Sequence, residues 1–145
     1  MKLKPVIWLI PFLIALFVQC SSKKSLNVLI ITGGHGFERE PFFEMFKSFE
    51  NITFSEAVHP HANRYFAPEA AKDIDVFVFY DMNQEITREE KENLLAMAQK
   101  GKGLIFLHHS LASYQAWEKF LQLIGGRYLL NSMVINNTEY PASTY

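Results

Sequence analysis

The chain has 145 residues, of which 49% are hydrophobic and 14% aromatic, and its formal net charge is −1. This composition is typical of a globular protein and excludes a disordered chain. The sequence holds no arginine cluster and no lysine-rich stripe interleaved with aromatic residues, so we expect no nucleic-acid partner. The length predicts one domain, which we place at residues 26–145.

Residues 1–20 form a segment of their own. Lys2 and Lys4 precede an apolar run over residues 6–18, which is shorter than the roughly 20 residues that span a bilayer. We therefore predict a signal peptide over residues 1–20, followed by a short linker over residues 21–25. Without Lys2 and Lys4 the net charge falls from −1 to −3.

Cys20 is the only cysteine and stands at the end of this segment. Its position resembles a bacterial lipoprotein signal, in which the cysteine becomes the lipidated first residue. Gln19 stands where a small residue is usual, so simple secretion and an uncleaved N-terminal anchor remain alternatives. We expect an exported protein of the bacterial cell envelope, in the periplasm or outer membrane, that contacts the membrane through this segment. A single cysteine also excludes an internal disulfide.

The first half of the domain predicts a strand, a helix and a second strand. Residues 26–32 (LNVLIIT) form the continuous apolar run of a strand buried on both faces. Pro41 suits the first turn of a helix, and a short strand follows at residues 52–57. The apolar face of the helix consists of Phe42, Phe46 and Phe49. Residues 59–72 carry two prolines and little periodicity, which predicts a surface loop with one short helical turn.

The second half repeats this alternation. Residues 75–80 (DVFVFY) and 103–107 (GLIFL) predict two further buried strands. Between them, Thr87 and Glu90 form a capping box that begins a helix, and Gly101 ends it.

A last helix is predicted over residues 115–124, whereas residues 129–145 show no clear periodicity. Strands that alternate with helices describe βαβ units. The expected fold class is therefore α/β, a three-layer sandwich with a mainly parallel sheet, as in flavodoxin-like and class I glutamine amidotransferase-like folds.

Polar residues follow three of the predicted strands. In a parallel α/β sheet, ligands bind beyond the carboxyl ends of the strands. The residues at these strand ends are Gly33, Gly34, His35, Gly36 and Glu38 after the first strand, Asp81 and Asn83 after residues 75–80, and His108, His109 and Ser110 after residues 103–107. Imidazole, carboxylate, amide and hydroxyl groups thus meet at one edge of the sheet, which is the candidate site.

Each candidate also has a structural interpretation. His35 suits a solvent-facing turn between glycines, and Asp81 suits a side-chain cap of a turn. Of His108 and His109, one is expected to face the edge while the other packs or bonds to the backbone.

Three familiar site types fit less well. His59 and His61 form an H-x-H pair that would suit a metal on a strand, but the proline between them favours a loop and a structural or solvent role. The glycines do not complete a dinucleotide fingerprint, because Arg39 stands at the third glycine, and Glu56 supports that reading only weakly. Ser110 lacks the two flanking glycines of a nucleophile elbow, which argues against a serine hydrolase.

Four segments carry a more specific signal through their order and spacing. They are VLIITGGHGFE, the strand end DVFVFYD, the block EEKENLLAMAQKGKGLIFLHHS, and WEKFLQLIGGRY. Together they resemble the ThuA-like domain, the trehalose-utilisation family with a class I glutamine amidotransferase-like fold. The resemblance covers residues 26–145.

This resemblance implies a role in carbohydrate catabolism, with a disaccharide such as trehalose or a 3-keto sugar as the small-molecule partner. It implies a role for His108, which we expect to act as general acid or base or as ligand of a divalent metal, with His35 and Asp81 orienting substrate hydroxyls. The predicted substrate-binding residues are Gly34, Gly36, Glu38, His109 and Ser110. The amidotransferase relatives carry a nucleophilic cysteine after the strand that corresponds to residues 103–107, and its absence here argues against glutamine hydrolysis. A hydrolase or isomerase acting on a sugar is the expected type of enzyme.

The sequence also departs from the family pattern. Family members usually continue beyond the GGRY segment with a further histidine-proline stretch and an acidic segment, whereas this chain stops at Tyr145. We therefore expect an incomplete domain. A non-catalytic carbohydrate-binding or accessory module, and a fragment without activity, are the alternatives to an enzyme.

Overall fold

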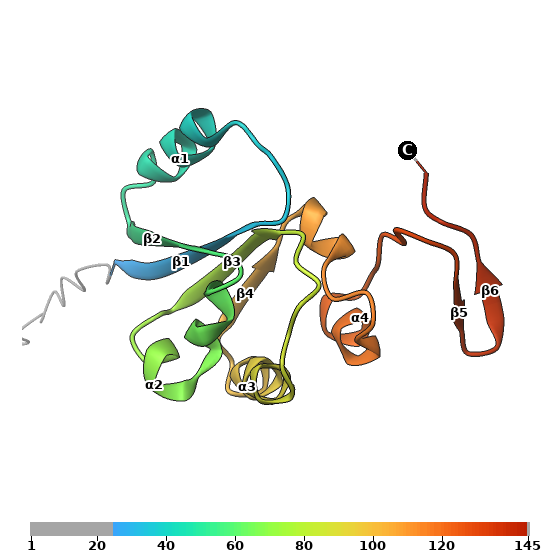
Figure 1. Cartoon of the computed structure of the whole chain (residues 1–145). Coiled ribbons are helices and arrows are strands. Elements are labelled where there is room, and N and C mark those ends of the chain that lie inside the picture. The colour runs from blue at the N-terminus through green and yellow to red at the C-terminus, as the bar shows by residue number, and fades with distance from the viewer. Residues whose placement is uncertain (1–24, 145) are drawn as a thin grey trace, which may run out of the picture.

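The computed structural model describes residues 25–144, so the predicted signal segment, Cys20 and most of the linker lie outside the described residues. Within residues 25–144 the main feature is a four-stranded, all-parallel sheet in the order β2-β1-β3-β4. Its strands are β1 (Leu26–Gly33), β2 (Ile52–Val58), β3 (Val76–Asp81) and β4 (Gly103–Phe106). Helices cover both faces, which confirms the predicted α/β fold (Figure 1).

The helices are divided unequally between the two faces of the sheet (Figure 1). Helix α1 (Arg39–Lys47) packs on one face through Phe46, next to Val28, Ile30 and Val78. The other face is covered by α2 (Pro68–Ala71), α3 (Arg88–Gln99), α4 (Glu118–Ile124) and the short 3-10 helix η1 (Ala62–Phe66). A second 3-10 helix, η2 (His108–Ala112), follows β4 at the carboxyl edge of the sheet.

The strands are apolar on both faces because both faces are buried. Ile30 of β1 faces the α1 side and Ile31 faces the opposite side, and both are 0% exposed. A strand with continuous rather than alternating apolar residues needs a helix layer on each face. The predicted capping box of α3 is also confirmed, since Thr87 and Glu90 each bond to the other's backbone N–H.

Several sequence predictions need correction. Phe49 lies beyond the end of α1 and is 49% exposed, so it does not belong to the buried face. Residues 59–72 are not a surface loop, because they contain η1 and α2 and bury Ala62 and Phe66 completely. Helix α4 begins at Glu118 rather than at residue 115.

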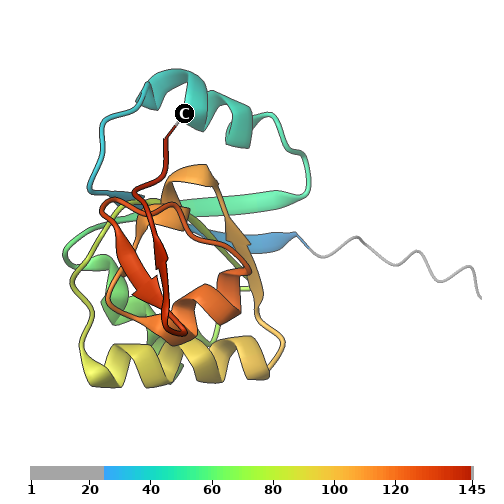
Figure 2. The same ribbon diagram turned by 90° about the vertical axis from the view of Figure 1, so that its right-hand side faces the viewer.

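The C-terminal stretch forms a β-hairpin where no element was predicted. Strands β5 (Met133–Ile135) and β6 (Thr138–Tyr140) pair antiparallel and lie apart from the main sheet, in front of α4 in Figure 2. Asn136 and Asn137 connect them with φ of 50° and 63°, the conformation of a two-residue hairpin turn. No helix among residues 25–144 is long and apolar enough to cross a membrane.

Candidate functional site

The turn between β1 and α1 brings His35 to the carboxyl edge of the sheet. Gly34 has a φ of +82° and lies so close to the carbonyl of Met82 that a Cβ would stand 2.3 Å from its oxygen. Only glycine takes this conformation and this approach without strain. The His35 ring is held by two carbonyls, with Nε2 3.1 Å from the oxygen of Tyr80 and Nδ1 3.1 Å from that of Gly36. A neutral ring donates to one of these oxygens at a time.

Three imidazole rings lie in contact at this edge. His35 stacks on His109 with ring centroids 3.9 Å apart and an interplanar angle of 10°. His108 lies 4.1 Å from His109, and Tyr80 packs edge-on against His109 at 5.4 Å. Residues separated by more than 70 positions therefore converge here because the carboxyl ends of β1, β3 and β4 lie side by side.

The three histidines line one pocket of about 410 Å³. The remaining lining residues are Met82, Leu111, Ala112, Tyr128 and Leu130. His108 is exposed and His109 is partly buried, yet both reach the pocket, so neither is simply a packing residue. A pocket with an apolar wall and a few convergent polar groups is the usual form of a small-molecule site.

His109 is the member of this cluster with the most perturbed environment. Its Nδ1 is buried and has no hydrogen-bond partner. Burial lowers the pKa of His109 below the usual 6.5, and the neighbouring His35 and His108 lower it further. The lowered pKa favours the neutral ring at pH 7, in which one of the two nitrogens carries no proton.

Replacing His108 with glutamine is expected to raise the pKa of His109, because one neighbour that disfavours its protonation is removed. The effect can be followed by ¹H–¹³C NMR of the histidine rings as a function of pH. His61→Gln is the matched control, since His61 is exposed and lies outside this cluster. An unchanged His109 titration in His108→Gln would contradict the proposed coupling.

Asp81 lies beneath the pocket rather than on its wall. It is 0% exposed, and its carboxylate accepts hydrogen bonds from Ser110 Oγ at 2.8 Å, Ser113 Oγ at 3.2 Å and His59 Nε2 at 3.0 Å. Ser110 is also 0% exposed, and its hydroxyl is engaged with Asp81. Direct contact of Asp81 or Ser110 with a substrate does not fit this burial, and we instead assign both to holding η2 in place.

His59 is the residue of this network that sequence reasoning missed. Its side chain is 4% exposed, and it bonds to Asp81 where β2 leaves the sheet. A signal was present, because His59 lies two residues after the strand predicted at residues 52–57 and so near the same carboxyl edge. Pro60 directed the interpretation toward a solvent-exposed loop instead. His61, the other histidine of the H-x-H pair, is exposed.

The other predicted substrate-binding residues lie outside the pocket wall. Glu38 is exposed and does not line the pocket. Gly34 serves the close approach to Met82, and Gly36 contributes its carbonyl to His35. These three residues shape the turn that carries His35.

Glu56, the carboxylate that a dinucleotide site would need, is already engaged within the protein. The Glu56 carboxylate accepts hydrogen bonds from Nη1 and Nη2 of Arg39 and from the hydroxyl of Thr32. Burial alone would raise the pKa of Glu56, but the bonds from Arg39 and Thr32 outweigh it and bring the pKa below its usual value. Glu56 therefore anchors α1 to the sheet.

Residues 25–144 contain no group of three or more histidine, cysteine, aspartate or glutamate side chains placed to hold a metal ion. In the histidine cluster, His35 and His109 face each other with their ring planes and not with their nitrogens. Comparison with family models, with curated proteins and with solved structures finds no match for this chain.

Proposed function

We propose that this chain is an exported ThuA-like protein that performs acid–base chemistry on a sugar or sugar derivative, such as a disaccharide or its 3-keto form. The observation that carries the proposal is the contact of three imidazoles, His35, His108 and His109, on the wall of one pocket. Imidazole has an ordinary pKa near neutrality, so it can both accept and donate a proton there.

The environments of the histidines favour different roles. The lowered pKa of His109 favours the neutral ring, and because its Nδ1 is buried, a role as general base falls to Nε2. His108 is more exposed at the pocket mouth, which suits proton exchange with solvent and with a leaving group. His35 is held by the carbonyls of Tyr80 and Gly36 and supports the His109 ring by stacking.

The pocket wall supports a sugar as the ligand. Leu111, Tyr128 and Leu130 line the same pocket as the three imidazoles and contribute apolar surface to it. A pyranose ring has an apolar face of C–H groups and a polar rim of hydroxyls, so it can use both kinds of surface.

The turnover of a 3-keto-disaccharide is expected to fall at least about a hundredfold in His109→Ala and in His108→Ala, the lower end for loss of a general acid or base. His61→Ala removes an exposed histidine outside the pocket and should leave the rate unchanged. Product formation by the full chain can be followed by chromatography. Full activity in both pocket variants would refute the acid–base role.

A non-catalytic carbohydrate-binding module is the second candidate. The shortage of charged groups on the pocket wall favours it, because binding of a neutral sugar needs no ionised residue. Sugar binding that persists in His109→Ala without turnover by the parent chain would support this module over the enzyme.

A further inference from the structure

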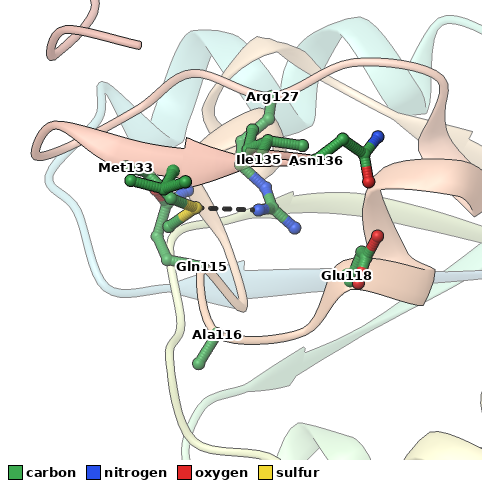
Figure 3. A pocket seen from close by; sticks show the side chains of 8 residues that line it. Gln115, Ala116, Glu118, Arg127, Met133, Ile135 and Asn136 are labelled. Carbon is green, nitrogen blue, oxygen red and sulfur yellow. Dashed lines mark hydrogen bonds between the residues drawn. The ribbon is translucent and has the colours of Figure 1, made fainter. Parts of the chain in front are cut away.

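A second pocket lies between α4 and the β5–β6 hairpin and has a volume of about 220 Å³. It shares no lining residue with the histidine pocket. Arg127 projects into it, with Met133 on one side and with Glu118 and Asn136 on the other (Figure 3). Met133 and Ile135 of β5 make part of its wall apolar.

The Arg127 guanidinium is incompletely satisfied by the protein. Its Nη2 donates to the carbonyl oxygen of Trp117 at 2.9 Å, and its Nη1 donates to the thioether of Met133 at 3.3 Å. A thioether is a weak acceptor. Among residues 25–144 no carboxylate forms an ion pair with Arg127.

Partial burial makes this arrangement costly for a cation. Burial lowers the pKa of Arg127, and the charge of Glu118 opposes that change without a direct ion pair. Guanidinium stays protonated in proteins, so the charge persists. A partly buried charge with a weak acceptor on one of its N–H groups is stabilised when a ligand supplies a stronger one.

We propose that this pocket binds a small carboxylate whose oxygens accept hydrogen bonds from Arg127 in place of the Met133 sulfur. Arginine presents its N–H groups as a planar fork that matches a carboxylate, and the resulting bonds are charge-assisted. The pocket is lined by a single cation and by Glu118, which favours a monoanion over a dianionic phosphate. Glu118 and Asn136 then face the rest of the ligand, where they suit a hydroxyl or ammonium group.

The site is independent of the sugar pocket and of its proposed chemistry. Hydroxy- and amino-carboxylates share the group that Arg127 recognises, and they differ in what they present to Glu118. Lactate and alanine are therefore suitable probes, with inorganic phosphate as the third. The sequence has four arginines, at residues 39, 64, 88 and 127, so the Nε–Hε NMR signal of Arg127 can be assigned by its loss in Arg127→Lys.

Titration of the full chain at constant ionic strength is expected to shift the Arg127 signal saturably with lactate or alanine, and more weakly with phosphate. Glu118→Gln should weaken alanine binding and strengthen lactate binding, because a negative charge is removed. Calorimetry of Arg127→Lys should show affinity at least about tenfold weaker for the better carboxylate, since the charge-assisted fork is lost.

Two variants separate binding from folding. Met133→Leu keeps the volume of the wall and removes the sulfur acceptor, so carboxylate affinity should be unchanged or tighter. Arg64→Lys, which changes an exposed arginine outside the pocket, should have no effect. The absence of a saturable shift with both carboxylates, tighter binding of phosphate, or unchanged affinity in a folded Arg127→Lys protein would overturn the proposal.

Discussion

Replacing Asp81 with alanine is expected to lower the free energy of unfolding by about 3–5 kcal/mol, the range for breaking a buried hydrogen-bonded charge network. The carboxylate is 0% exposed and accepts bonds from His59, Ser110 and Ser113. Its removal leaves the His59 and Ser110 donors without an acceptor, whereas Ser113 keeps the backbone carbonyl of residue 81. Each unsatisfied buried group costs about 1–3 kcal/mol. Domains of this size have total stabilities of about 5–15 kcal/mol, so a large share would be lost.

Urea denaturation followed by circular dichroism measures this loss. Glu50→Ala is the matched control, because Glu50 is exposed, and its effect should lie within about 0.5 kcal/mol. Asp81→Asn keeps the volume and one acceptor oxygen, so it should destabilise less than Asp81→Ala. A loss below about 1 kcal/mol in Asp81→Ala would show that water or rearrangement satisfies the donors, contrary to the burial of this network.

The same network explains how the histidine pocket is supported. Asp81 ends β3, Ser110 and Ser113 lie in and just after η2, and His59 follows β2. One carboxylate therefore ties three segments together directly under the pocket wall. Because η2 carries His108 and His109, a change at Asp81 should reach the pocket without any contact between Asp81 and a ligand.

The sheet could be predicted from sequence because its signals are local. Residues 26–32 and 75–80 are continuous apolar runs, and the capping box of Thr87 and Glu90 marks the start of α3. The turn of the C-terminal hairpin was also encoded, since two asparagines readily take the positive φ that such a turn needs. The flanking strands are only three residues each, which is too short for a periodicity to stand out.

The buried polar contacts were harder to predict because they depend on the tertiary fold. Asn63 is polar, yet it is 2% exposed and accepts a hydrogen bond from Tyr114, a residue 51 positions away. No local sequence pattern predicts a contact between two residues so far apart. Sequence reasoning brought His35, His108 and His109 to one edge correctly, but it could not tell that Asp81 and Ser110 would turn inward toward His59.

The glycines around His35 allow the site geometry to be tested without changing a histidine. Gly34 has a φ of +82°, and a Cβ there would stand 2.3 Å from the carbonyl oxygen of Met82. Since the nearest atoms belong to the backbone, a side chain cannot be accommodated by a rotamer change. Gly36 lies two residues away in the same turn and has no atom within 4 Å of its hypothetical Cβ.

Gly34→Ala is therefore expected to lower the free energy of unfolding by about 2–4 kcal/mol, because of left-handed backbone strain and displacement of the Met82 carbonyl. Gly36→Ala should change the free energy of unfolding by no more than about 0.5 kcal/mol. Displacement of the turn should also separate His35 from His109 and raise the pKa of His109 toward its usual value. Urea denaturation and histidine NMR measure the two effects. Equal stability of the two variants would contradict the close approach of Gly34 to Met82. An unshifted His109 pKa would show that the stacking of His35 on His109 does not depend on this approach.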